Sequence, residues 1–314
     1  MHLGNARSFL ITWARARQLG GELLLRIEDL HLERTKAGAL EQIFDDLKWL
    51  GLDWDIGPQS CVKAQNDPIF LQSNRRDFYR KGLDQLRDSG KIYPCSCTRK
   101  DLLNFQSAPH PGEELHYPNH CRDRNTADVI QEAKLKGKPL SWRFKVHHLE
   151  TSFIDALMGI STTNVNDWSG DFIVARGKDD VGYQLAVVLD DVDQGVTEVV
   201  RGDDLLLSTH RQLQVLEALG KNAPNHLHLP LLLGEDGIRL AKRHGDWKIS
   251  TLRALGHTPE RVLGLISWTL GWSDYQSSIS AADFLDAFNL KNMTPTAFSI
   301  PTDVSFDMGV AKQG

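Results

Sequence analysis

The strongest constraint on the fold is an alternation of short apolar runs with amphipathic helical stretches along most of the chain. Five runs carry strand signals: ELLLRI (22–27), SWRFKV (141–146), DFIVAR (171–176), TEVVRG (197–202) and HLPLLL (228–233). Apolar residues recur at helical spacing in the stretches around them: 3–17, 36–50, 69–89, 183–191, 211–219 and 259–271. This alternation predicts the α/β class, with a mostly parallel, doubly wound sheet of the Rossmann type.

Composition and charge exclude several classes of protein. The net charge of -5 gives no general attraction to nucleic acid, so any basic surface must be local. The chain lacks the run of about 18 apolar residues that a membrane span requires, and MHLGNARSFL has no signal-peptide pattern. Three of the four cysteines are grouped, which suits a metal site better than disulfides. A reducing, cytoplasmic location is therefore expected.

Two glycine-containing stretches have the chemistry of phosphate binding. HLGN (2–5) opens a predicted helix, where free backbone N–H groups and the helix dipole favour an anion. GIRLAKRHGD (237–246) places Arg239, Lys242 and Arg243 between two glycines, and such a basic loop can close on a polyphosphate. Taken singly, the first is more often an ordinary helix start and the second a solvated basic turn.

The grouped cysteines lie in a loop-like segment rich in proline and histidine. Cys95 and Cys97 are one residue apart, and Cys121 follows shortly after Tyr117. On a turn, neighbouring sulfurs can reach one ion, and thiolates suit tetrahedral Zn²⁺. The alternative is apolar packing of the thiols, for which a loop segment is a poor setting. Chemistry alone leaves the fourth ligand equally open to His110, His116 or His120, since a phenolate is an unusual ligand.

HLGN and RLAKR resemble the two signature motifs of class I aminoacyl-tRNA synthetases. Longer stretches resemble the glutamate-specific branch of that family: RIEDLHLER (26–34), GDFIVAR (170–176), YQLAVVLDDVDQGVTEVVRGDDLL (183–206) and HLPLLL (228–233). The resemblance covers roughly residues 1–275, and 183–206 is its most specific part. The cysteine pattern and the short remainder of the chain are similar to the family of short paralogues, the glutamyl-Q tRNA(Asp) synthetases.

This resemblance implies a ligase that works in two steps. ATP, accompanied by Mg²⁺, and L-glutamate would form glutamyl-adenylate, and glutamate would then pass to the queuosine base in the anticodon stem-loop of tRNA(Asp). The enzyme is expected to act as a monomer and to have no membrane partner. The alternatives are a truncated glutamyl-tRNA synthetase that charges a tRNA 3′ end, and a non-catalytic remnant that binds RNA or a nucleotide.

The resemblance also implies roles for particular residues. It assigns ATP binding to His2, Gly4, Asn5 and Lys242, with His2 and Lys242 as the catalytic residues. It assigns glutamate binding to Glu28, Tyr183 and Arg201. It makes Tyr117 the fourth ligand of a structural zinc ion held by Cys95, Cys97 and Cys121. For Glu28 the alternative is a structural ion pair, for example with Arg26.

Four parts are predicted along the chain. Residues 1–92 and 168–234 would form the two halves of the nucleotide-binding domain. Residues 93–167 would be an insertion that carries the zinc site. Residues 235–314 would hold the signature loop and a C-terminal helical region.

In the family that the chain resembles, a strand leads into the helix that HLGN opens. Such a strand would be central and parallel, and without it backbone groups and an apolar slot would stay unpaired. We therefore expect a form extended at the N-terminus by about ten to fifteen residues to be more stable and better at adenylate formation. Thermal midpoints and glutamate-dependent ATP–pyrophosphate exchange of both forms measure this, and equal behaviour contradicts it.

Overall fold

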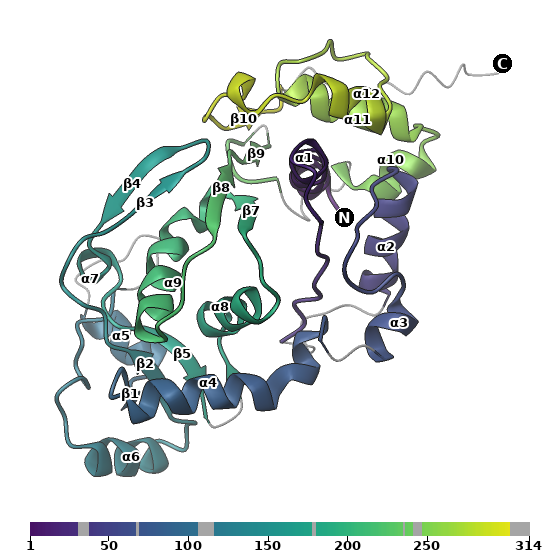
Figure 1. Cartoon of the computed structure of the whole chain (residues 1–314). Helices are drawn as coiled ribbons and strands as arrows, with labels where there is room; N and C mark the ends of the chain where they lie inside the picture. The colour runs from purple at the N-terminus through teal and green to yellow at the C-terminus, as the bar shows by residue number, and fades with distance from the viewer. Residues whose placement is uncertain are drawn as a thin grey trace.

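The computed structural model describes residues 1–30, 38–66, 69–105, 116–177, 180–234, 236–240 and 247–301. Figure 1 shows α1 (Leu3–Gln18) and α2 (Ala39–Trp49) on one side of the molecule and the β3–β4 hairpin on the other. Helix α8 (Tyr183–Asp193) lies between these two sides. Within these ranges, no helix is both long enough and apolar enough to cross a lipid bilayer.

One four-stranded sheet is mixed and has the order β4-β3-β8-β7. Strand β7 (Glu198–Gly202) pairs in parallel with β8 (Asn225–Leu229), and α9 (Leu206–Ala218) makes the crossover between them. Strands β3 (Thr151–Asp155) and β4 (Gly159–Thr163) form an antiparallel hairpin. The hairpin joins the sheet through a parallel pair between Asp155 and His226. The α/β class is confirmed, but parallel pairing extends less far than predicted in the described residues.

A second four-stranded sheet is antiparallel, with the order β1-β2-β5-β6. Its members are β1 (Ile92–Cys95), β2 (Ser141–Phe144), β5 (Phe172–Arg176) and β6 (Asp180–Val181). Helix α6 (Thr126–Leu135) packs against β1, and α4 (Arg76–Asp88) packs against β6 and α8. The sheet therefore joins strands from both sides of residue 167, where the sequence predicts the end of an insertion.

The predicted strand ELLLRI is present only as single bridges, which corrects the sequence-based expectation. Leu24 bridges to Ile56 and Ile27 bridges to Leu71, both in parallel. The backbone N–H of Leu25 donates to the carbonyl of Ile56, whereas that of Ile27 donates to Phe70. The partner segment changes within three residues, so no continuous ladder forms.

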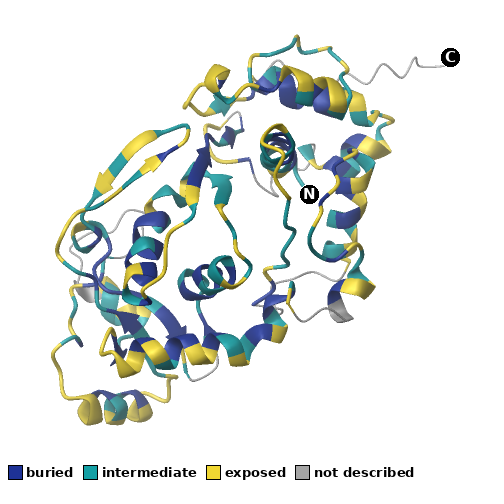
Figure 2. Cartoon of the chain, viewed as in Figure 1, coloured by how far each residue is buried: buried dark blue, intermediate teal, exposed yellow. Residues whose placement is uncertain are grey.

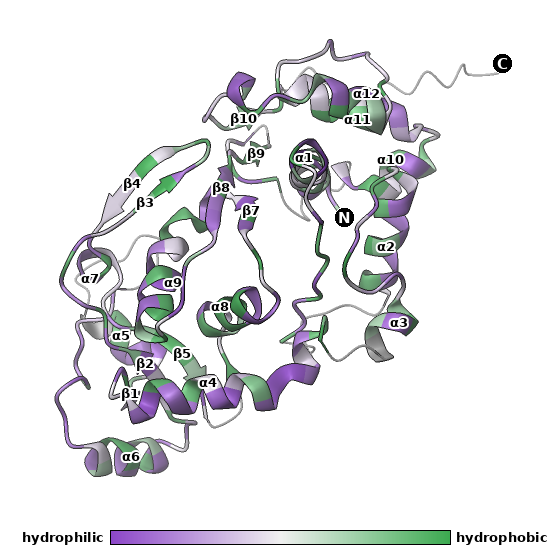
Figure 3. Cartoon of the chain, in the orientation of Figure 1, coloured by the Kyte–Doolittle hydropathy of each residue, from purple (hydrophilic) through white to green (hydrophobic). Residues whose placement is uncertain are grey.

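Two buried clusters hold these elements together. The first joins α1 and α2 to α10 (Ile249–Ala254), α11 (Pro259–Thr269) and α12 (Ala281–Ala287). The second joins α4, α8 and α9 to β5. Figure 2 shows the resulting pattern on α6, which is buried on its inner side and exposed on its outer side. Figure 3 shows α4 as largely hydrophilic along its exposed length.

Smaller elements complete the described chain. They are α3 (Cys61–Asn66), η2 (Gln72–Arg75), α5 (Arg99–Phe105), α7 (Val165–Trp168), η3 (Asp203–Leu205), β9 (Leu232–Leu233), η5 (Leu290–Asn292) and β10 (Phe298–Ser299). Strands β9 and β10 pair in parallel.

Candidate active site

Residues 2–5 form the start of α1, as HLGN predicts. His2 is the N-cap, and its Nδ1 accepts a hydrogen bond from the backbone N–H of Asn5 at 3.3 Å. A Cβ on Gly4 would lie 3.3 Å from the His2 ring, so glycine leaves room for the imidazole beside the first turn. The ring therefore occupies the end of the helix where backbone N–H groups favour an anion.

The segments that flank the basic signature loop lie beside this helix start. The backbone of His2 bridges to Lys248, and the N–H of Ile249 donates to the carbonyl of Met1 at 2.9 Å. Leu240 is buried in the same cluster as Leu3. Lys242 and Arg243 lie outside the described residues, so the lysine assigned to catalysis stays a prediction. The neighbourhood of the two motifs, which the hypothesis requires, is present in their described flanks.

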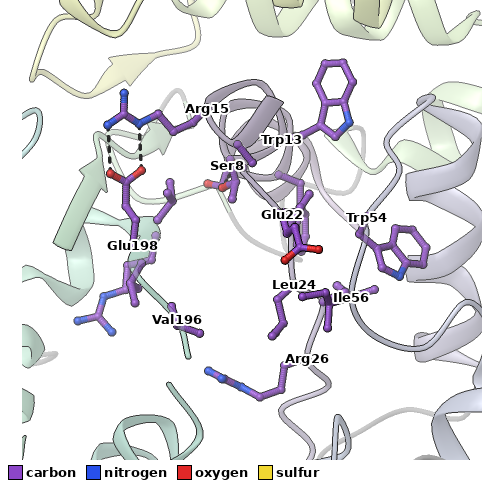
Figure 4. A pocket seen from close by; sticks show the side chains of 18 of the residues that line it. Ser8, Trp13, Arg15, Glu22, Leu24, Arg26, Trp54, Ile56, Val196 and Glu198 are labelled. Carbon is purple, nitrogen blue, oxygen red and sulfur yellow. Dashed lines mark hydrogen bonds and ion pairs between the residues drawn. The ribbon is translucent and has the colours of Figure 1, made fainter. Parts of the chain in front are cut away.

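A cavity of about 830 Å³ lies between α1, residues 21–28, β7 and α8. Figure 4 shows Leu24 and Ile56 on one side of it, Val196 and Glu198 on the other, and Arg26 pointing into the space between them. Three predicted glutamate-binding residues and one predicted ATP-binding residue line this cavity: Glu28, Tyr183, Arg201 and Asn5. His2 and Gly4 do not line it.

The edge of β7 that faces away from β8 borders the same cavity. The strand expected ahead of Leu3, and the gain in stability expected from it, stay predictions.

Arg201, at the end of β7, is held by a set of neutral acceptors. Its Nη1 donates to the hydroxyl of Tyr183 at 3.1 Å, and its Nη2 donates to Thr209 at 2.6 Å and to Gln212 at 2.7 Å. Its Nε donates to Nε2 of His228 at 3.2 Å. Among the residues that the structure describes, no carboxylate lies within ion-pair distance of Arg201. A half-buried guanidinium that faces a cavity without a counter-ion is suited to an anionic ligand.

Tyr183 stands beside Arg201 at the start of α8. Burial raises the pKa of its phenol, and the neighbouring Arg201 cation only partly opposes that effect. The hydroxyl therefore stays protonated, and it accepts the Arg201 hydrogen bond while its own proton can be donated. Tyr183, Val187 and Asp191 follow at intervals of four residues on α8 and all line the cavity.

Glu28 makes the ion pair that the structural alternative predicts. Its Oε1 lies 3.1 Å from Nη2 of Arg26, which also contacts Asp191 at 2.8 Å. Burial acts to lower the pKa of Arg26. The carboxylates of Glu28, Asp191 and Asp190 together outweigh that effect, so the pKa is raised. The Glu28 side chain is 40% exposed, and it remains accessible to an ammonium group from the cavity. The ion pair and ligand binding are thus compatible.

The three grouped cysteines meet in space. The sulfurs of Cys95, Cys97 and Cys121 all lie within 4.8 Å of one another, which fits a three-thiolate metal site. Hydrogen bonds from Cys95 and Cys97 lower the pKa of the Cys121 thiol. The hydrogen bond with Cys121 in turn raises the pKa of the Cys97 thiol. A lowered pKa favours the thiolate, the form that binds a metal. The cysteines also pack in a small buried cluster, so packing and metal binding coexist.

Tyr117 lies at this centre. Its hydroxyl oxygen is 3.4 Å from Sγ of Cys95 and accepts the backbone N–H of Cys121 at 2.8 Å. His116 is turned to the carbonyl of Asn166, with its Nε2 3.0 Å away, and His110 lies outside the described residues. Among the described histidine, cysteine and acidic side chains, the metal-binding group contains only the three cysteines. Tyr117 as fourth ligand stays a proposal.

Two residues that support this centre were missed by the sequence analysis. Arg143 donates from Nε to Sγ of Cys95 at 3.2 Å, and its guanidinium lies 3.5 Å from the centre of the Tyr117 ring. Gly170 has a φ of 64°, and a Cβ there would lie 1.8 Å from the carbonyl oxygen of Tyr117. The close approach lets Tyr117 N–H bond to the carbonyl of Ser169 at 2.9 Å.

His226, on β8, stacks on the ring of His228 and gives a testable pH dependence of stability. Burial lowers its pKa to about 4, against about 6.5 in an unfolded chain. The unfolded state therefore binds the proton more readily between these values. The free energy of unfolding is therefore unaffected by this histidine above pH 6.5. It falls as the pH drops toward 4, by on the order of 3 kcal/mol in total.

Urea unfolding at pH 7.5, 5.5 and 4.5 of the protein and of His226→Leu measures this effect. We expect the difference in unfolding free energy between the two proteins to change with pH, because leucine has no proton to bind. Parallel profiles would contradict the assignment of this loss to His226.

The comparisons with known proteins decide the family. The family model described as "tRNA synthetases class I (E and Q), catalytic domain" matches residues 1–302. The chain belongs to this family. It is thus an enzyme of the ligase type, and the family predicted from HLGN, RLAKR and the longer stretches is confirmed.

Relatives of this class I synthetase fall into two length groups. A glutamyl-Q tRNA(Asp) synthetase from Symbiobacterium thermophilum is 42% identical over 305 residues, which are 96% of the chain and 93% of the relative. One from Rhodopirellula baltica is 44% identical over 274 residues, 83% of the chain and 79% of the relative. A glutamate–tRNA ligase from Aquifex aeolicus is 36% identical over 306 residues, but the chain, 95% of which is matched, spans only 62% of it.

The fold of the class I synthetase chain also resembles a solved structure. The crystal structure of a glutamate-tRNA synthetase from Elizabethkingia anophelis superposes with a TM-score of 0.77 at 24% identity. The match covers 96% of this chain and 66% of that one. At this identity the likeness establishes the shared fold.

Proposed function

We propose that the chain activates L-glutamate with ATP and transfers the glutamyl group to the queuosine base of tRNA(Asp). The observation that carries the proposal is Arg201, a cation without a carboxylate partner among the described residues, in one cavity with Glu28 and Tyr183. A cation and a carboxylate facing one cavity complement an amino acid that carries an ammonium group and an acidic side chain. The higher identity to the glutamyl-Q tRNA(Asp) synthetases, 42% and 44%, than to the glutamate–tRNA ligase, 36%, favours the queuosine-directed reaction over the charging of a tRNA 3′ end.

The first step requires orientation and charge stabilisation. A carboxylate oxygen of glutamate attacks the α-phosphorus of ATP, and pyrophosphate leaves with the electrons of the broken P–O bond. The first turn of α1, with His2, Gly4 and Asn5, would hold the phosphates, together with Lys242 and the Mg²⁺ that accompanies ATP. Arg201 and Tyr183 would bind a glutamate carboxylate, and Glu28 the ammonium group.

The second step transfers the activated glutamate. A hydroxyl oxygen of the queuosine ring attacks the carbonyl carbon of the adenylate, and AMP leaves while the hydroxyl proton passes to a phosphate oxygen or to water. The acceptor would be presented by the anticodon stem-loop of tRNA(Asp). The metal centre of Cys95, Cys97, Tyr117 and Cys121 would take a structural Zn²⁺ that fixes the loop after β1. We place this activity in the cytoplasm and assign it to the monomer.

ATP–pyrophosphate exchange and transfer of labelled glutamate test the proposal. Exchange should occur with glutamate and without tRNA, and transfer should require tRNA(Asp) that contains queuosine. Glutamine and aspartate serve as amino-acid controls, and Lys242→Ala should abolish both reactions. Charging of tRNA(Glu) at its 3′ end, with no transfer to queuosine, would establish the truncated synthetase instead. Absence of all exchange would establish the non-catalytic remnant.

A further inference from the structure

A buried series of hydrogen bonds connects the β3–β4 hairpin to the guanidinium of Arg201. Asp155, the last residue of β3, accepts the backbone N–H of His228 at 2.9 Å and its Nδ1 at 2.7 Å. On the other side of the ring, Nε2 of His228 faces two donors, the Nε–H of Arg201 at 3.2 Å and the hydroxyl of Thr209 at 3.0 Å. The side chains of Asp155 and His228 are both 0% exposed, so water cannot take over either contact.

Asp155 decides which ring nitrogen of His228 can accept. Burial alone would raise the pKa of Asp155, but hydrogen bonds from His228 and from the backbone of Met158 and Leu157 outweigh it and lower the pKa. The carboxylate is therefore ionised, and it places the imidazole proton on Nδ1. Nε2 keeps its lone pair as an acceptor for the Nε–H of Arg201 and for the hydroxyl of Thr209, which itself accepts from Nη2 of Arg201. The opposite tautomer would direct an N–H at the N–H of the guanidinium.

The contact at Nε adds to the contacts that fix the plane of the guanidinium. Thr209 and Gln212 hold Nη2, and Tyr183 holds one N–H of Nη1. Of the five N–H donors of an arginine, these contacts and His228 leave one on Nη1. The guanidinium is planar, so its orientation changes by rotation about the Cδ–Nε bond. Loss of the acceptor at Nε would leave only the Nη contacts to restrain that rotation, and the remaining donor would be less well directed.

We propose that Asp155 and His228 are positioning residues that hold Arg201 in the orientation that binds glutamate. The proposal rests on the proposed function, because it requires Arg201 to be a glutamate ligand. It also connects the hairpin to the pocket, since Asp155 reaches His228 from a strand 73 residues away in the chain.

Two substitutions of His228 separate the two sides of its ring. His228→Asn keeps an amide near Nδ1 that can donate to Asp155 but places nothing at Nε2. His228→Gln places an amide oxygen near Nε2 that can accept from Arg201. We expect His228→Asn to raise the glutamate KM about tenfold with the ATP KM within twofold, and His228→Gln to stay within about threefold for both.

Asp155→Asn tests whether the carboxylate acts through the ring. An amide at 155 no longer enforces the Nδ1 tautomer, so the glutamate KM should rise about tenfold in the presence of His228. Combined with His228→Gln, the same substitution should change the KM less than about twofold, because glutamine has no tautomer to lose. An equal effect in both backgrounds, or equal effects of His228→Asn and His228→Gln, would overturn the proposal.

A spectroscopic readout separates this proposal from the function on which it rests. In protein labelled with ¹⁵N-arginine, the Nε–H signal of Arg201, assigned by its absence in Arg201→Lys, should exchange slowly with solvent. It should be lost in His228→Asn and kept in His228→Gln. The same signal in both variants would overturn the positioning role even in an active enzyme. A different result would reject the proposed function and keep the positioning role. In that case the Arg201 Nε–H signal changes as expected, but the unaltered protein shows no glutamate-dependent ATP–pyrophosphate exchange.

Discussion

Substitution of Arg201 by lysine is expected to raise the glutamate KM about a hundredfold while the ATP KM stays within about twofold. Lysine keeps the positive charge but cannot reproduce the fork that joins His228, Tyr183 and Thr209. The remaining acceptors would compete with the substrate for its single ammonium group. A hundredfold effect corresponds to roughly 3 kcal/mol of lost binding to the glutamate carboxylate. Glutamate-dependent ATP–pyrophosphate exchange at varied glutamate and ATP concentrations measures it.

Arg15→Lys provides a matched control on the same cavity. Arg15 also lines the cavity, but its guanidinium is already paired with Glu198 through contacts of 2.9 and 3.1 Å (Figure 4). We therefore expect little change in the glutamate KM on substitution of Arg15. Similar KM values for both variants would show that Arg201 does not bind the substrate carboxylate, and thermal midpoints would check that both variants are folded.

Substitution of Cys97 by serine is expected to release one zinc ion per chain and to lower the free energy of unfolding by several kcal/mol, about 3–5. Cys97 is the least buried of the grouped cysteines, so a serine fits there without a packing defect. The loss would therefore report ligation rather than packing. Metal content by elemental analysis and urea unfolding, with and without a chelator, measure it.

Cys61→Ser is the control for that substitution. Cys61 is a free, half-buried thiol outside the metal-binding group, so its change should leave both the metal content and the chelator effect unaltered. Tyr117→Phe examines the fourth ligand in the same assay. It should weaken zinc retention, because it removes the oxygen beside Cys95 and the acceptor for the Cys121 N–H. Unchanged zinc content in Cys97→Ser would contradict the metal site.

The resemblance to the family, rather than any local pattern, points to Glu28, Tyr183 and Arg201. The structure brings all three to one cavity, and their roles in binding glutamate stay predictions. ELLLRI was predicted less well, because a strand signal does not show that its hydrogen-bond partner changes from Ile56 to Phe70. Lys242 lies outside the described residues, so its place in the site is untested.

The residues that sequence reasoning missed come from distant segments. Asp155 meets His228 only because β3 joins β8, and Arg143 reaches Cys95 only because β2 pairs with β1. No local pattern around either residue indicates a site. The i, i+4, i+8 series that starts at Tyr183 was a readable signal for two further cavity residues, Val187 and Asp191.

The contact between Gly170 and Tyr117 bears on any attempt to move the cysteine-bearing segment into another protein. The segment is fastened at this point by two hydrogen bonds. The N–H of Tyr117 donates to the carbonyl of Ser169, and the backbone N–H of Asp171 donates to the side-chain Oδ1 of Asn119 at 2.7 Å. A graft cut between the last cysteine and β5 would therefore fail to reproduce the loop. A transplantable unit has to include Gly170 and the first residues of β5, and only glycine will tolerate the junction.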